Sequence, residues 1–277
     1  MPQLPPGLPP QPLPRLLVTR PQPQADEWVA RLQALGLQAA ALPLLAIGDA
    51  PQATAVPAAW ATLPGRALVM FVSPTAVQRF FAGRPAGAAW PAGTLAGSTG
   101  PGTAAALRAQ GLAEPLLVTP PDDAPRFDSE ALWLQLQQRR PPPVWPGARV
   151  LIVRGEGGRD WLAGTLAEAG AQVDFVEAYR RQPPRLDAAG QALLAAAVAA
   201  PQAHAWLVSS SEALGHLARL APAADWSAAC ALATHPRIAE SAQALGFGRV
   251  HRVSPSPLAV RDLLQRLQAG EAAGPAL

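Results

Sequence analysis

Internal repetition is the feature of this sequence that most restricts its fold. Residues 15–45 and 150–179 each contain an apolar strand, a polar turn, an amphipathic helix and a second strand. Identical residues coincide when the two segments are aligned without gaps. The matching pairs are Arg20/Arg154, Asp26/Asp160, Leu32/Leu166, Gly36/Gly170 and Gln38/Gln172. Two copies of a strand–helix–strand unit indicate an α/β protein that arose by duplication.

The repetition continues beyond these two units. Residues 67–112 and 205–247 each add two further pieces of the form strand, small-residue turn, helix. The first strand of each strand–helix–strand unit is a continuous apolar run, which is typical of a parallel sheet covered by helices on both faces. The predicted fold class is therefore α/β, with two similar doubly wound parallel-sheet domains. Gly36 and Gly170 fall where a helix ends and a left-handed residue is favoured.

Six turns connect these strands to the helices that follow them. They are residues 19–22, 73–75, 98–103, 154–159, 209–212 and 234–237. Free N–H groups at helix starts can bind an anion, although Ser, Thr and Gly are also ordinary helix caps. An arginine accompanies four of the turns: Arg20, Arg154, Arg159 and Arg237. We therefore expect the turns to line one interdomain cleft that binds a polyanion.

The composition excludes several kinds of chemistry. All 22 basic residues are arginine, so no lysine can form a Schiff base, act as a general base or complete a Walker-A motif. The single cysteine, Cys230, excludes an intramolecular disulfide and a multi-thiolate metal site. It reads as a buried strand residue. The four histidines lack metal-ligand spacing, so we predict no metal.

Binding of nucleic acids or nucleotides is also disfavoured. The net charge is only +3, the chain has one tyrosine, and basic residues do not cluster with aromatic ones. The glycine-rich runs 97–102 and 155–158 do not complete a dinucleotide or P-loop signature. We predict that the chain binds neither DNA nor RNA. Trp28, Trp133 and Trp161 lie at helical spacing and are predicted to be core residues.

The ends of the chain predict a cytoplasmic protein. Residues 1–14 contain seven prolines and should form a solvated, polyproline-like tail. This segment has no basic start and no apolar core, so it is not a signal peptide. No uninterrupted apolar run approaches the roughly 20 residues of a membrane span. We expect no membrane association.

Tyr179 is the only tyrosine and ends the second strand of the second unit. Two interpretations are open from the residues alone. The side chain could be an ordinary strand-end aromatic with its hydroxyl in water. It could also be a proton donor at the edge of the cleft.

Segments of this chain resemble the uroporphyrinogen-III synthase family, in the order that the family has them. They are LLVTRP (16–21), FVSPTAV (71–77), GPGTAAAL (100–107), FDSEAL (127–132), VRGEGGRDWL (153–162), VEAYRR (176–181), SSSEAL (209–214) and HPRIAESA (235–242). The resemblance covers about residues 15–255. Its most specific part runs from VRGEGGRDWL to VEAYRR.

The resemblance implies a discontinuous first domain and a two-stranded connector. The first domain would contain residues 15–44 and 182–266, and the second would contain 48–176. Residues 45–47 and 177–181 would form the connector, and 267–277 a flexible tail. The active site would lie in the interdomain cleft.

The resemblance also implies an activity. Family members cyclise hydroxymethylbilane, a linear tetrapyrrole, with inversion of ring D and loss of water through a spirocyclic pyrrolenine, without a cofactor or metal. This is a lyase step of haem biosynthesis. We expect a monomer. Its only other protein contacts would be transient ones with neighbouring enzymes of the pathway.

By the same matching, Tyr179 is the expected catalytic acid, and the resemblance favours this role over the strand-end alternative. The same matching implies that Ser73, Thr103 and Ser210 bind the substrate's carboxylates through their hydroxyls and backbone N–H groups, and that Arg154 and Arg159 do so through charge-assisted bonds. Arg20 and Arg237, which lie in the predicted turns, are two further binding candidates. The turn at Arg237 departs from the family pattern, because some members have Gly-Pro-Thr-Thr where this chain has His-Pro-Arg-Ile. Two alternatives remain. One is a non-enzymatic two-domain anion-binding or regulatory relative, and the other is a nucleotide-using α/β enzyme.

Overall fold

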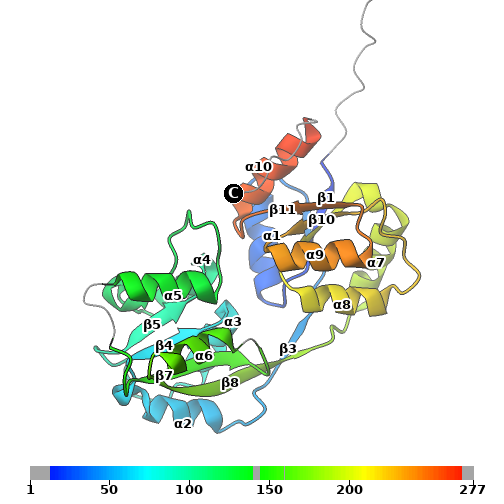
Figure 1. Cartoon of the computed structure of the whole chain (residues 1–277). Helices are drawn as coiled ribbons and strands as arrows, with labels where there is room; N and C mark the ends of the chain where they lie inside the picture. Colours follow the sequence, from blue (N-terminus) through cyan, green and yellow to red (C-terminus); the bar gives the residue numbers. More distant parts are fainter. Residues whose placement is uncertain (1–12, 140–143, 159, 270–277) are drawn as a thin grey trace, which may run out of the picture. The chain divides into compact units, whose positions relative to one another are not determined.

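The computed structural model describes residues 13–139, 144–158 and 160–269 (Figure 1). Arg159, one of the predicted binding residues, lies outside the described residues, as does most of each predicted tail. The chain divides into two compact units. Unit 1 contains the described residues up to Ala46 and from Gln182 onward, and unit 2 contains Ile47–Arg181.

Unit 1 is built on a five-stranded sheet in the order β11-β10-β9-β1-β2. Its strands are β1 (Arg15–Val18), β2 (Ala39–Ala41), β9 (His204–Val208), β10 (Cys230–Ala233) and β11 (Arg249–Arg252). Its helices are α1 (Gln24–Ala34), α7 (Ala188–Ala199), α8 (Ser211–Leu220), α9 (Pro236–Leu245) and α10 (Pro257–Gln268). Each adjacent strand pair in this sheet is parallel.

Unit 2 is built on a six-stranded sheet in the order β3-β8-β7-β4-β5-β6. Its strands are β3 (Ala46–Gly48), β4 (Leu68–Phe71), β5 (Leu95–Ser98), β6 (Leu117–Val118), β7 (Arg149–Gly155) and β8 (Gln172–Gln182). Its helices are α2 (Ala55–Ala61), α3 (Pro74–Ala82), α4 (Pro101–Ala109), α5 (Ser129–Gln138) and α6 (Trp161–Glu168). The pairs from β8 to β6 are parallel.

The two sheets share one strand order, as the repetition predicts. Reading β11-β10-β9-β1-β2 against β6-β5-β4-β7-β8 aligns β1 with β7, β9 with β4, and β10 with β5. These are the strand pairs that match in sequence. The parallel α/β fold is therefore confirmed, and each unit contains one strand–helix–strand repeat together with two strand–turn–helix pieces.

The chain passes between the units in two hydrogen-bonded strands. One passage is at Ala46–Ile47 in β3, and the other is at Arg181–Gln182 in β8. A two-stranded connection therefore links the units.

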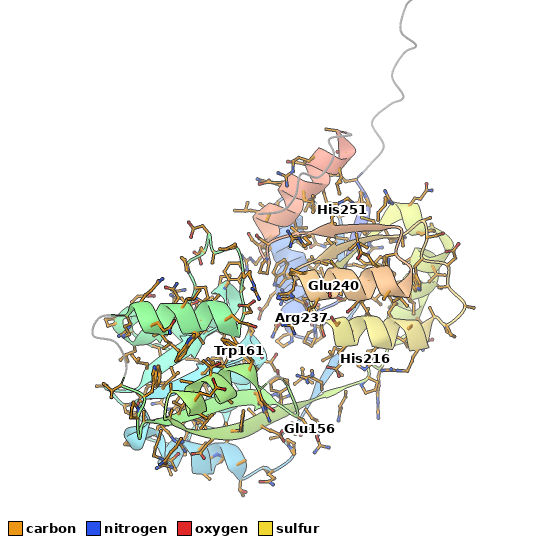
Figure 2. The ribbon with its side chains drawn as sticks, viewed as in Figure 1. Glu156, Trp161, His216, Arg237, Glu240 and His251 are labelled. Atoms are coloured by element: carbon orange, nitrogen blue, oxygen red, sulfur yellow. The ribbon has the colours of Figure 1, made fainter. Side chains whose placement is uncertain are left out.

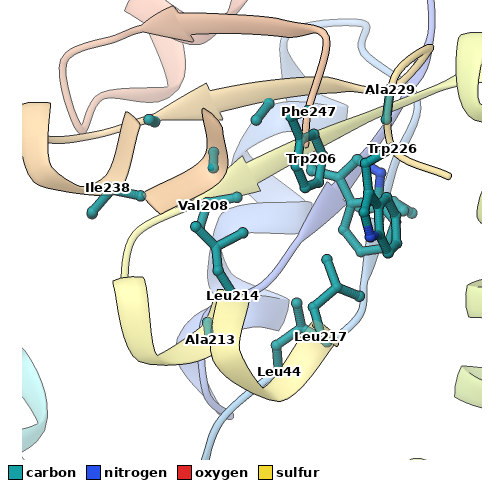
Figure 3. Close-up of a cluster of buried hydrophobic side chains, with 14 of the residues drawn as sticks. Leu44, Trp206, Val208, Ala213, Leu214, Leu217, Trp226, Ala229, Ile238 and Phe247 are labelled. Carbon is teal, nitrogen blue, oxygen red and sulfur yellow. The ribbon is translucent and has the colours of Figure 1, made fainter. Parts of the chain in front are cut away.

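Each sheet is buried on both faces. In unit 1, Leu17, Trp206 and Ala231 pack with α7, α8 and α9, and Figure 3 shows part of this cluster. Trp226 stacks on Phe247 with ring centroids 5.1 Å apart. The opposite face packs against α1 and α10 through residues that include Cys230, which is 4% exposed as predicted. Alternate residues of β4 and β7 divide in the same way between two clusters in unit 2.

Gly36 and Gly170 end equivalent helices in the predicted left-handed conformation, with φ of +80° and +94°. The Gly36 N–H donates to the Gln33 carbonyl at 2.9 Å, and the next N–H donates to Leu32 at 3.1 Å. Gly170 makes the same pair of bonds one repeat later. Both helices thus end in a Schellman motif, which uses their last free carbonyls.

Two local predictions were wrong. The strand predicted over residues 37–45 is only Ala39–Ala41, because the Leu42 N–H donates to the Val18 carbonyl and the Leu44 N–H to the very next carbonyl, Thr19, so the regular register with β1 ends there. Trp161 is 42% exposed, because it is the first residue of α6 and precedes the buried stripe of that helix. Trp28 is buried, as predicted.

In the parts of the chain that the structure describes, no helix is both long and apolar enough to cross a membrane.

Candidate functional site

Tyr179 and Ser73 meet at the carboxyl-terminal edge of the unit 2 sheet. The Tyr179 hydroxyl oxygen lies 3.1 Å from the Ser73 Oγ, within hydrogen-bond distance. Ser73 is the N-cap of α3, and its Oγ also accepts a bond from the Ala76 N–H at 3.1 Å. The phenol is therefore linked through one hydroxyl to the N-terminus of α3.

The loop after β7 is attached to the strand that carries Tyr179. The Glu156 N–H donates to the Tyr179 carbonyl at 2.8 Å, and the Gly157 N–H donates to Glu177 Oε1 at 3.2 Å. The Arg181 guanidinium also donates to the Glu156 carbonyl at 3.1 Å. These bonds fix the glycine-rich segment beside the catalytic candidate rather than leaving it as an open nucleotide loop.

Arg154, at the end of β7, is held by two contacts. Its Nη1 lies 2.6 Å from Asp160 Oδ1, and its guanidinium is 3.9 Å from the ring centroid of Phe175. The side chain is 15% exposed, whereas that of Asp160 is 68% exposed. The ion pair therefore has one solvated partner, and a substrate carboxylate could replace the Asp160 carboxylate on this arginine.

Thr103 lies in the first turn of α4, after β5. It is buried, and its N–H already donates to the Gly100 carbonyl at 3.1 Å. The family resemblance implies that Thr103 binds a carboxylate through both its N–H and its hydroxyl. The structure leaves the hydroxyl for that role, because the N–H is used within the helix start.

Arg20 occupies the turn after β1 in unit 1. Its guanidinium carbon lies 4.5 Å from the ring centroid of Trp28. Its Nε is buried and has no hydrogen-bond partner among the described residues. Burial lowers the pKa of Arg20 to about 10. A buried cation without a counter-ion is costly, and an anionic ligand would compensate it.

Ser210 and Arg237 follow β9 and β10 at the same edge of the unit 1 sheet. Ser210 is the N-cap of α8 and makes no side-chain capping bond. Arg237 is exposed in the first turn of α9, where its N–H donates to His235 Nδ1 at 3.2 Å. Figure 2 labels Arg237 on α9, and labels Glu156 and Trp161 after β7 in unit 2.

The predicted residues therefore form two groups at the carboxyl ends of parallel strands. Ser73, Thr103, Arg154 and Tyr179 lie at the edge of the unit 2 sheet, and Arg20, Ser210 and Arg237 lie at that of unit 1. That these edges face one cleft stays a prediction. No cluster of three or more His, Cys, Asp or Glu that could hold a metal is found in the described ranges.

Two aromatic residues and one glycine support the candidate site without having been predicted to do so. Trp28 lies against Arg20 but was predicted only as a core residue. Phe175 lies against Arg154 and was not predicted to have any role. Gly155 contacts the Tyr179 ring and appeared in the sequence only as one glycine of a loop. The pairing of β7 with β8 is what brings Gly155 beside Tyr179, and only that pairing would have identified Gly155 as part of the site.

Comparison with known proteins gives a consistent result. The family model described as "Uroporphyrinogen-III synthase HemD" matches residues 26–261. The chain is 32% identical to the uroporphyrinogen-III synthase of Escherichia coli K12 over 239 residues, covering 84% of this chain and 92% of the relative. It is 35% identical to that of Salmonella typhimurium LT2 over 179 residues, covering 64% of this chain and 69% of the relative.

The fold is also found in a solved structure. A crystal structure of a mutant uroporphyrinogen III synthase from Thermus thermophilus aligns with a TM-score of 0.56 and 19% identity, covering 92% of this chain and 99% of that chain. At this identity the likeness concerns the fold alone. Together with the family model, which matches most of the sequence, it leads to one assignment: this chain belongs to the uroporphyrinogen-III synthase family.

Proposed function

We propose that this chain is an active uroporphyrinogen-III synthase, a lyase of haem biosynthesis. It cyclises hydroxymethylbilane with inversion of ring D and loss of water. The observation that carries the proposal is the pair formed by the Tyr179 and Ser73 hydroxyls, 3.1 Å apart at the carboxyl edge of a parallel sheet. Ligands of open α/β sheets bind at this edge, and the family relatives bear the same enzyme name.

Tyr179 acts as the general acid. Its phenol gives a proton to the hydroxymethyl oxygen at the end of the linear tetrapyrrole that ring D attacks; water leaves, and the substrate becomes an azafulvenium cation. Attack within the substrate forms the spirocyclic pyrrolenine, which fragments and recloses with ring D inverted. The proton released when the last pyrrole regains aromaticity restores the phenol, so the step is balanced. Ser73 stabilises the phenolate by donating a hydrogen bond while the N-terminus of α3 lies behind it.

The arginines and hydroxyls bind the substrate's acetate and propionate groups. Arg20 is the strongest candidate, because its Nε is buried and has no hydrogen-bond partner among the described residues, and burial lowers its pKa. Arg154 contributes a charge-assisted bond, and Ser210 and Thr103 contribute hydroxyl donors. Arg237 is exposed and can add a further charge, and Arg159 is proposed on the family resemblance alone. The proposed reaction needs no cofactor or metal.

Folding of the substrate accounts for most of the rate, and the acid accounts for the remainder. Correct placement of reacting groups can be worth about 7–11 kcal/mol, whereas a general acid typically contributes about 10²–10⁴-fold. Loss of the acid should therefore slow turnover strongly without abolishing binding.

Tyr179→Phe tests the proposal. Hydroxymethylbilane is supplied to the purified wild-type and variant proteins, and the porphyrin isomers are separated after oxidation. We expect the wild type to give the type III isomer. The variant should lose turnover by about 10²-fold or more while binding uroporphyrinogen III as the wild type does. Near-normal turnover of the variant would remove the acid role. Type I isomer alone from the wild type would favour the non-enzymatic alternative.

A further inference from the structure

The ring of Tyr179 lies directly against the backbone of Gly155. A Cβ built on Gly155 would lie 2.7 Å from Tyr179 Cε2 and 2.8 Å from Cζ. Non-bonded carbon atoms normally approach to about 3.5–4.0 Å. Gly155 is not in the left-handed region, so its backbone conformation does not require glycine. What requires glycine here is the volume that the ring occupies.

A β-bulge brings the two residues together. Along the β7–β8 ladder Arg154 pairs with Glu177, but Gly155 pairs with Tyr179 instead of Ala178. Bulges change the direction of side chains locally and are common next to active sites. Without this shift the small side chain of Ala178 would lie opposite Gly155, and the phenol would be displaced along the strand.

The contact fixes the direction of the phenol hydroxyl. The ring is buried in the core of unit 2, with Tyr179 4% exposed, so its position is set by packing. Its backbone is held by the bond from the Glu156 N–H, immediately after Gly155. In this position the hydroxyl reaches Ser73 Oγ at 3.1 Å. A ring displaced by about 1 Å would leave that hydrogen-bond range.

We propose that Gly155 is a positioning residue for catalysis: the missing side chain leaves the space in which the Tyr179 ring lies with its hydroxyl at Ser73. This inference rests on the proposed role of Tyr179 as the acid. Gly155 itself contacts only the ring and takes no part in proton transfer. A methyl group at this position moves the ring, lengthens the contact with Ser73 and misdirects the acid.

Gly155→Ala is the direct test, with Gly164→Ala as the matched control. Gly164 lies in α6, and a Cβ there would have no heavy atom within 4 Å. The chain has a single tyrosine, so ¹³Cζ-labelled tyrosine gives one NMR signal that reports Tyr179 alone. We expect Gly155→Ala to shift that signal and to lower kcat by about 10²-fold with KM within about threefold. The control should leave the signal and kcat unchanged.

Two double variants separate positioning from general damage. In a Tyr179→Phe background the hydroxyl is already absent, so adding Gly155→Ala should lower kcat no further. In a Tyr179→Ala background the ring is absent. Any loss of melting temperature that Gly155→Ala causes in the wild type should then largely disappear. If Gly155→Ala alone does not fold, recovery of folding in the Tyr179→Ala background supports the same contact.

The outcomes distinguish this inference from the proposed function. If Tyr179→Phe keeps normal turnover, the acid role fails, while the NMR signal and the stability coupling still test the contact. An unshifted signal with unchanged kcat in Gly155→Ala would overturn the inference. So would an equal loss of stability with and without the Tyr179 ring.

Discussion

Replacing Arg20 with methionine should raise stability and weaken ligand binding at once. Burial lowers the pKa of Arg20 to about 10, which corresponds to a cost of about 3 kcal/mol for its charged form, since one pKa unit is about 1.36 kcal/mol. The contact with the Trp28 ring at 4.5 Å returns about 1–2 kcal/mol. The burial cost minus the gain from the Trp28 contact leaves a net cost of about 1–2 kcal/mol in the free energy of unfolding. An uncharged side chain should remove this cost.

Methionine is a suitable replacement because it keeps the long apolar stem that packs on Trp28. The free energy of unfolding should rise by about 1–2 kcal/mol in urea titration, with the melting temperature higher by about 2–4 °C per kcal/mol. Loss of a charge-assisted bond should weaken binding of uroporphyrinogen III by about 10–100-fold. Arg31→Met is the control, because Arg31 is exposed on α1, the helix that carries Trp28.

The reasoning is refuted if Arg20→Met destabilises the protein and leaves product affinity unchanged. Arg20 would then be a structural residue whose partner is within the protein. A gain in stability with unchanged affinity would mean that the buried charge is real but that the ligand's carboxylates bind elsewhere.

Two further predictions concern stability. Gly170→Ala should cost about 1–2 kcal/mol in the free energy of unfolding, because φ is +94° there and the new Cβ would lie 3.0 Å from Pro146 Cα; an unchanged urea midpoint would contradict this. Burial, and secondarily the charge of Arg249, lower the pKa of His251 below its ordinary 6.5. The unfolded chain therefore binds more protons just below pH 6.5, so stability falls as the pH drops through that region. His251→Gln should make unfolding less sensitive to pH between about 7 and 5, and an identical pH dependence would exclude this contribution.

Much of the architecture was predictable from periodicity and spacing. Continuous apolar runs such as that at β7 have both faces buried, as a doubly wound sheet requires. Gly36 and Gly170 end their helices as predicted, because a left-handed helix end strongly favours glycine. These features are local, so the sequence shows them directly.

The details of the candidate site were less predictable. The turn that carries Ser73 was expected to line a cleft and Tyr179 was expected to end a strand, but the hydrogen bond between them joins residues far apart in the chain. The bulge at Gly155 has no sequence signature, since it arises from how β7 meets β8. Trp161 was misassigned because helical spacing does not show where a helix begins.

The sequence by itself determined that the chain contains two copies of one α/β plan. The repeat alone does not show which half of one copy shares a sheet with which half of the other. The repeat suggests that 15–112 and 150–247 are the two units, yet β1 pairs with β9 (Leu17↔Trp206) and β4 pairs with β7 (Val69↔Leu151). Backbone hydrogen bonds between parallel strands are alike for any apolar sequence, so a strand shows that it has neighbours but not which ones. The tertiary structure decides this, because side chains from both faces must pack around the paired strands.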